Sequence, residues 1–342
     1  MPPADLAERI PELMARARVP GLSVASIEDG RLTWSGAFGR KHRDSDEPVD
    51  TGTVFQAASL SKPVFAYAVL KLVERGVLTL DRPLASYLPA SAHLDDALSE
   101  QVTARQVLCH MTGWPNWRPA GQPLRREAAP GARFGYSGEG YVYLQRCVEH
   151  VTGQPLDALV RATVFEPMGL PDSSYAWAAP RDAAVAAGHD RDGAPSARYV
   201  GEHPNAASSL HTTPRDFARF LAALLTVGNE PWRLGQASVS EMLRPQARID
   251  ERIAWGLGWG LAATAAGQSF WHWGDNPGYK CFAVALPATR TGVVVMTNGD
   301  GGLEVCAAIV RRMLAGDHPA FAWLSRRGWY QPSASPQGSR RQ

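Results

Sequence analysis

The sequence holds few cysteines, and their spacing is not that of a metal site. Only 4 of the 342 residues are cysteine, and no CxxC pair or HExxH segment occurs. Closely spaced Cys and His ligands are what protein zinc sites need, so we predict neither a metal ion nor another cofactor. All four cysteines have apolar neighbours, and we expect them to be reduced, packed side chains: Cys109, Cys147, Cys281 and Cys306.

The chain also lacks a surplus of charge and any long apolar run. Its 35 Lys and Arg residues nearly balance 33 Asp and Glu residues, so we expect no nucleic-acid partner. No stretch approaches the roughly 18 apolar residues of a membrane span, and the first residues do not read as a signal peptide. We therefore expect a cytoplasmic protein without a membrane partner, acting on a small molecule; a trimmed secreted form is the open alternative. The sequence leaves its oligomeric state open.

What is present is a regular alternation of helix and strand patterns. Residues 21–27 and 32–38 are β-rich runs joined by a turn with Asp-Gly, which predicts a hairpin. Helical periodicity marks residues 1–18 and then 60–75, ending at Gly76. Further helices are expected at 103–110, 140–152, 156–165, 214–225 and 303–314, and strands at 255–261, 269–273, 280–286 and 292–297.

Strands at both ends with helices between them predict an α+β fold. We expect one α/β domain formed by residues 1–78 and 230–318, and a mostly helical domain inserted at 79–229. Residues 326–342 are rich in Ser, Pro, Gln and Arg, so we expect a mobile tail there.

The segment Ser59-Leu60-Ser61-Lys62 opens an apolar helix. Residues three apart share a helix face, so Lys62 can reach the Ser59 hydroxyl. A serine hydroxyl needs a base to become a nucleophile, and a buried lysine with a lowered pKa can serve. Taken alone, the same pattern is more typical of a serine that caps a helix.

Two further segments carry polar groups that could join this pair. Tyr136 lies in a Gly-rich loop just before a helix, where its phenol could relay a proton. His272 lies on a predicted strand of sequence WHWG, whose Gly274 would let a substrate approach the backbone closely. Taken alone, each residue is more typical of a packing or structural side chain.

In this order, SxxK, then Tyr-Ser and then a basic residue before x-Gly, the three segments resemble the penicillin-recognising serine enzymes. The closest resemblance is to the branch with class C β-lactamases, D-peptidases and related esterases. It runs from Gly21 to about Gly301 and includes the segments ARQVLCHMTG (104–113), PGARFGYS (130–137), FEPMGL (165–170), TTPRDFARF (212–220) and GLGW (256–259).

The resemblance implies a fold and a set of roles. The fold is an antiparallel sheet flanked by N- and C-terminal helices, with an inserted all-α region. Ser59 would be acylated, Lys62 would be its base, and Tyr136 would act as acid or base. His272 stands where β-lactamases carry a lysine, and it could act as a charge, a hydrogen-bond donor or a wall. The oxyanion hole would be the backbone N–H groups of Ser59 and Asp275.

Two departures from this family bear on the substrate. Gly138 stands where the family usually has an asparagine that contacts lysine and substrate amide, although Glu139 beside it could compensate or simply serve the helix start. Trp273 replaces the threonine that helps to hold a substrate carboxylate. Both departures favour an ester or small amide over a β-lactam. The aromatic side chains of Trp114, Trp117, Trp273 and Tyr279 could together form an acyl or alcohol pocket.

The sequence therefore favours an esterase that works through an acyl-enzyme, with weak or no β-lactamase activity. A D-amino-acid peptidase or amidase is an alternative if Asp275 or Glu139 binds a substrate amine. A β-lactamase or an acyltransferase of the same family also remains open. The non-enzymatic alternative is a protein that only binds a β-lactam or a peptidoglycan fragment.

Overall fold

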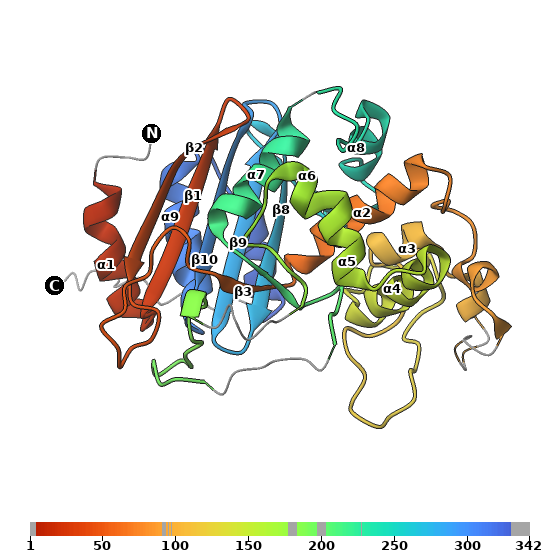
Figure 1. The fold of residues 1–342 in the computed structure, drawn as a ribbon, viewed down its shortest axis with the longest axis horizontal. Coiled ribbons are helices and arrows are strands. Elements are labelled where there is room, and N and C mark those ends of the chain that lie inside the picture. The colour runs from red at the N-terminus through yellow and green to blue at the C-terminus, as the bar shows by residue number, and fades with distance from the viewer. Residues whose placement is uncertain are drawn as a thin grey trace, which may run out of the picture.

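The computed structural model describes residues 5–90, 94, 96, 98–176, 183–196, 203–226 and 228–329. Its centre is an eight-stranded antiparallel sheet with the strand order β2-β1-β10-β9-β8-β7-β6-β5 (Figure 1). Strands from both ends of the chain thus share one sheet, as the sequence predicts. The strands are β1 (Gly21–Glu28), β2 (Arg31–Gly39), β5 (Ala247–Arg248), β6 (Ile253–Trp255), β7 (Gly260–Thr264), β8 (Gly267–Asn276), β9 (Tyr279–Leu286) and β10 (Thr291–Thr297).

The first hairpin forms as predicted. β1 and β2 pair in antiparallel register, with Glu28 opposite Arg31. The two turn residues, Asp29 and Gly30, both have positive φ, at 51° and 71°. This backbone suits the right-handed twist of the strands and favours Asp-Gly.

Helices cover both faces of the sheet. In β10, Val293 and Val295 pack with α1 (Leu6–Ala17), α9 (Gly302–Met313) and α10 (Pro319–Arg326). The alternate residues Val294 and Met296 point into the other core, toward α7 (Pro214–Leu225). Successive strand residues face opposite sides, so burial on both sides requires the continuous apolar run seen in this strand. α7 falls within the stretch 79–229 expected to form the helical domain, yet it packs on the sheet.

A helical region adjoins the sheet, to the right in Figure 1. Its central helix α2 lies within residues 1–78, which were expected to belong to the α/β domain. It is buried from Ser61 to Leu72, so it lies inside the protein rather than on its surface. The helices are α2 (Ser61–Glu74), α3 (Ala104–Leu108), α4 (Gly138–Thr152), α5 (Leu156–Val160), a π turn (Arg161–Phe165) and α6 (Glu166–Met168), with α8 (Gln236–Met242) nearby.

A second, two-stranded sheet links the two regions. It consists of β3 (Phe55–Ala58) and β4 (Leu210–Thr212), and the sequence patterns did not indicate it. A methyl group built on Gly274 of β8 would come within 2.3 Å of the Ala57 carbonyl oxygen. β3 therefore lies directly against the end of β8, and it leads straight into α2.

Two expectations about the second half of the chain were wrong. Residues 255–261 do not form one strand, because the chain turns through Gly258, with φ at +85°, between β6 and β7. The tail expected at 326–342 was assigned to begin too early, because Trp329 stacks on Trp273. Residues 330–342 lie outside the described part. All four cysteines are buried and free, as expected. None of the described helices is long and apolar enough to cross a bilayer.

Candidate active site

Ser59 lies in the turn between β3 and α2, half-buried. The residue before it, Ala58, has a positive φ of 50°, a strained backbone for alanine that functional sites often contain. Ser61 holds this turn: its hydroxyl donates to the Ala58 carbonyl at 2.5 Å and accepts from the Leu210 N–H at 2.9 Å. Neither serine caps the helix, because α2 begins after Leu60 without a side-chain cap. Ser59 is left free to interact with Lys62.

Lys62 is fully buried, and its side-chain nitrogen has two partners. Nζ lies 3.0 Å from the Ser59 Oγ and 2.7 Å from the Ala207 carbonyl oxygen. Burial holds the pKa of Lys62 well below its usual value, because charging an amine away from water is costly. A neutral amine that donates to Ala207 keeps a lone pair for the Ser59 proton, which is what a general base requires.

Tyr136 flanks the same pair. Its ring lies 4.8 Å from the Lys62 Nζ, and the next residue, Ser137, caps α4 by accepting from the Gly140 N–H. Burial raises the pKa of Tyr136, an effect that Ser59 partly offsets. The phenol oxygen is buried close to Ser59, and no described residue makes a hydrogen bond of ordinary geometry with it. The phenol therefore keeps its proton in the resting site and can donate it.

His272 on β8 is buried and neutral. Its Nδ1 lies 2.7 Å from the Trp273 carbonyl oxygen, so this nitrogen carries the proton and Nε2 holds a lone pair. Burial, with Lys62 second, lowers the pKa of His272 to about 3. Of the three roles open from the sequence, a positive charge is therefore excluded near neutral pH.

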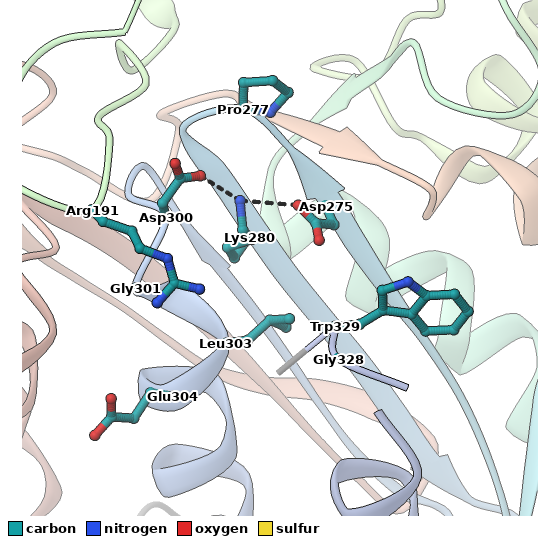
Figure 2. A pocket seen from close by; sticks show the side chains of 10 residues that line it. All are labelled: Arg191, Asp275, Pro277, Lys280, Asp300, Gly301, Leu303, Glu304, Gly328 and Trp329. Atoms are coloured by element: carbon teal, nitrogen blue, oxygen red, sulfur yellow. Dashed lines mark hydrogen bonds and ion pairs between the residues drawn. The ribbon is translucent and has the colours of Figure 1, made fainter. Parts of the chain in front are cut away.

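Asp275 comes directly after Gly274, the residue of β8 that lies against β3. Its backbone is therefore beside the turn that carries Ser59. The Asp275 carboxylate pairs with Lys280 at 3.0 Å, and Lys280 also pairs with Asp300 (Figure 2). A hollow of about 380 Å³ opens here. It is lined by Arg191, Asp275, Pro277, Lys280, Asp300, Gly301, Leu303, Glu304, Gly328 and Trp329.

Gly138 and Glu139 begin α4, and a loop is fastened over them. The Glu139 carboxylate accepts two hydrogen bonds from the Arg118 guanidinium, at 2.9 and 2.7 Å, and one from its N–H. The Trp117 ring lies over Gly138, where a built methyl group would be only 2.6 Å from it. Glu139 thus holds the loop, and the space of an asparagine side chain at 138 is filled by Trp117.

Most of the expected aromatic pocket is not formed. Trp114 is 1% exposed, and its indole N–H donates to Asp96 at 2.8 Å. The Tyr279 hydroxyl donates to the Ala186 carbonyl at 2.7 Å, so this side chain also belongs to the interior. Trp273 is 3% exposed and packs against Tyr136 with ring centroids 4.8 Å apart. Only Trp117, 46% exposed, offers an open aromatic surface.

Two residues at the site had no role in the sequence analysis. His110 lies in the matched segment ARQVLCHMTG and stacks on Tyr136 with ring centroids 4.2 Å apart. Trp329 stacks on Trp273 at 4.7 Å and meets Tyr136 edge-on at 5.5 Å. The segment match could have indicated the first residue, whereas no sequence signal links Trp329 to the site. The described residues include no group of three or more His, Cys, Asp or Glu that could hold a metal ion.

Comparison with known proteins identifies relatives along most of the chain. A family model described as Beta-lactamase matches residues 6–316. Penicillin-binding protein 4 of Amycolatopsis lactamdurans is 26% identical over 336 residues, which cover 90% of this chain and 88% of that protein. Esterase EstB of Burkholderia gladioli is 29% identical over 320 residues, covering 77% of this chain and 80% of that protein.

Solved structures show the same fold. A penicillin-binding protein homologue from Pyrococcus abyssi has a TM-score of 0.80 at 23% identity, over 94% of this chain and 80% of that chain. The D-alanine carboxypeptidase AmpC from Burkholderia cenocepacia has a TM-score of 0.78 at 21% identity, over 90% and 96%. α10 and Trp329 lie beyond the residues that the family model matches.

Proposed function

The chain belongs to the beta-lactamase family of serine hydrolases, and within that family we propose that it is an esterase that forms an acyl-enzyme on Ser59. The observation that carries the proposal is the contact between Ser59 Oγ and the buried Lys62 Nζ, 3.0 Å apart. A nucleophile and its base within hydrogen-bonding distance, in a site with a proton donor, are the elements of acyl transfer.

In acylation, the Ser59 Oγ attacks the ester carbonyl carbon and its proton passes to Lys62. The oxyanion is stabilised by the N–H groups of Ser59 and Asp275. When the carbon–oxygen bond breaks, the leaving alkoxide takes the Tyr136 proton and departs as an alcohol. Lys62 then returns its proton to the Tyr136 phenolate, which leaves both side chains neutral.

In deacylation, a water molecule attacks the acyl-enzyme carbonyl. Its proton is taken by Lys62, directly or through Tyr136, and the second tetrahedral intermediate uses the same two N–H groups. The Ser59 Oγ leaves and recovers a proton, and the carboxylic acid is released. If an alcohol or amine attacks in place of water, the same steps give acyl transfer.

An ester is favoured over a β-lactam because the site offers no charge at the position of the family's lysine. His272 is neutral there, and its lowered pKa of about 3 keeps it neutral at pH 7. Trp273 next to it is buried against other aromatic rings and presents no hydroxyl group. The 29% identity to Esterase EstB supports the same choice.

An amine-recognising peptidase or amidase is less well supported. It would need an unpaired carboxylate near Ser59, but the candidate Glu139 is bonded to Arg118 and the candidate Asp275 is paired with Lys280. A protein that only binds its ligand would not need Lys62 buried and in contact with Ser59. Both readings predict little turnover of a simple ester.

The test compares hydrolysis of p-nitrophenyl butyrate with that of a chromogenic cephalosporin. Wild type is measured beside Ser59→Ala, and Ser240→Ala, an exposed serine on α8, is the matched control. We expect ester turnover that disappears only in Ser59→Ala, with little cephalosporin turnover. Faster turnover of the cephalosporin would contradict the ester preference, and an active Ser59→Ala would contradict the proposed nucleophile.

A further inference from the structure

His110 binds the backbone N–H groups of the two residues next to Tyr136, Gly135 and Ser137. It follows α3, is fully buried, and has a positive φ of 58°. Its carbonyl oxygen accepts from the Gly135 N–H at 2.8 Å, and its Nδ1 accepts from the Ser137 N–H at 3.0 Å. Its ring also lies on the Tyr136 ring, with centroids 4.2 Å apart. One residue thus fixes the backbone and the side chain of Tyr136.

These contacts define the state of the imidazole. Nδ1 accepts from a backbone N–H, so it carries no proton, and the single proton of the neutral ring is on Nε2. Burial, with the nearby Lys62 and His272 after it, holds the pKa of His110 well below its usual value. A protonated ring would lose the bond to Ser137, so the environment that keeps His110 neutral also keeps that bond.

We propose that His110 is a positioning residue of the catalytic site, which holds the Tyr136 phenol in line with Ser59 and the leaving group. The inference rests on the proposed function, because it requires Tyr136 to donate a proton to the departing alkoxide. His110 itself touches no reacting atom. Its effect reaches the reaction only through the direction in which the phenol points.

If His110 only packed against Tyr136, an aromatic ring of similar size would be sufficient. Phenylalanine at position 110 provides such a ring. Positioning by hydrogen bonding needs an acceptor at Nδ1, and the asparagine side chain carries an amide oxygen at a similar place. Asparagine also tolerates positive φ better than most residues. His110→Asn and His110→Phe therefore separate the acceptor from the ring.

The leaving group provides a readout that lost packing would not change. The p-nitrophenolate ion departs without a proton, whereas ethoxide needs one, so only ethyl butyrate depends strongly on the Tyr136 proton. Because kcat/KM reports acylation, it is measured for both esters in each variant. For His110→Phe we expect a loss of about 10- to 100-fold on ethyl butyrate, at or below the lower end of general-acid effects, because the phenol is displaced and not removed. On p-nitrophenyl butyrate we expect a loss of under about 3-fold, and His110→Asn restores most of the ethyl butyrate activity.

Equal losses on both esters in His110→Phe, or no loss on either, would overturn the proposal. So would a His110→Asn variant as impaired on ethyl butyrate as His110→Phe. If His110→Phe does not fold, His110→Gln takes its place, because its longer side chain carries the amide away from the Nδ1 position. Tyr136→Phe must itself show the selective loss on ethyl butyrate. If Tyr136→Phe shows no selective loss, the proposed role of Tyr136 is wrong. If Tyr136→Phe shows the selective loss and His110→Phe does not, only the proposed role of His110 is wrong.

Discussion

The Trp117 ring lies so close over Gly138 that a methyl group built on the glycine would come within 2.6 Å of it. The loop that carries this tryptophan is fastened to α4 by the pair of Arg118 and Glu139. The first turn of α4 and the aromatic surface beside the site are therefore built as one unit. A change in any of these residues should affect the others.

Gly138→Ala should destabilise the protein by about 1 to 3 kcal/mol, because the added methyl group overpacks the contact with Trp117. Trp117→Ala in the same chain should relieve most of that cost. The measurement is urea unfolding of the two single variants and the double variant. Additive free energies would mean that the two residues do not compete for this space.

Glu139→Gln should loosen the loop without removing the catalytic residues. Burial raises the pKa of Glu139, but the hydrogen bonds from Arg118 outweigh this and the pKa is lowered overall. The stability from this pair is therefore present above the usual glutamate pKa and is lost as the pH falls below it. The free energy of unfolding, followed from pH 7 to pH 3, should decline less in Glu139→Gln. A double-mutant cycle with Arg118→Gln should give a coupling of about 1 to 3 kcal/mol. A coupling near zero would mean that the pair of Arg118 and Glu139 does not hold the loop on α4.

Lys62→Met should abolish ester hydrolysis and yet stabilise the fold at pH 7. The lowered pKa of Lys62 means that the unfolded chain binds one more proton than the folded one at pH values between that lowered pKa and 10.5. The stability of wild type therefore rises with pH there, by up to about 1.4 kcal/mol per pH unit. The gain in Tm from methionine should be largest near neutral pH and shrink as the pH approaches 10.

Lys71→Met on the same helix is the matched control for this prediction. Lys71 is also buried, but it pairs with Glu74 at 2.7 Å and donates to the Arg233 carbonyl. Removing it leaves a carboxylate without its partner, which is destabilising. We expect a lower Tm with ester hydrolysis retained. If Lys62→Met also lowered the Tm, burial of Lys62 would not be destabilising in the wild type.

Tyr136→Phe should reduce kcat/KM for ethyl butyrate by about 100-fold or more, and that for p-nitrophenyl butyrate far less. The raised pKa of Tyr136 supports an acid that holds its proton. The stability of the variant should change little, because the phenol oxygen has no hydrogen bond to lose among the described residues. Equal loss on both esters would indicate that Tyr136 acts as the base.

The features predicted well from the sequence are those determined by neighbouring residues. The contact of Ser59 with Lys62 follows from their three-residue spacing, which the turn before α2 keeps because the Lys62 N–H donates to the Ser59 carbonyl at 3.1 Å. The first hairpin follows from Asp29-Gly30 and its flanking strands. α7 was expected at the residues where it forms, because its capping threonine, first-turn proline and apolar periodicity are all local.

The remaining features depend on contacts between distant parts of the chain. Trp114 and Trp117 share one loop and cannot be told apart from the sequence. Trp114 is buried and donates a hydrogen bond to Asp96, whereas Trp117 lies over Gly138 at the surface. β3 and β4 are too short to show a pattern of their own; β3 packs against the end of β8, and β4 pairs with β3. The contact of Trp329 with Tyr136 could not be predicted from the sequence, because it depends on how α10 packs against the sheet.

This last contact has a practical consequence for anyone who handles the protein. Trp329 touches the side chain proposed to donate the catalytic proton. A fusion partner or a surface linkage joined close after Trp329 would therefore lie beside the reaction centre. Kinetic constants from protein tagged on that side should be compared with those from an N-terminally tagged form.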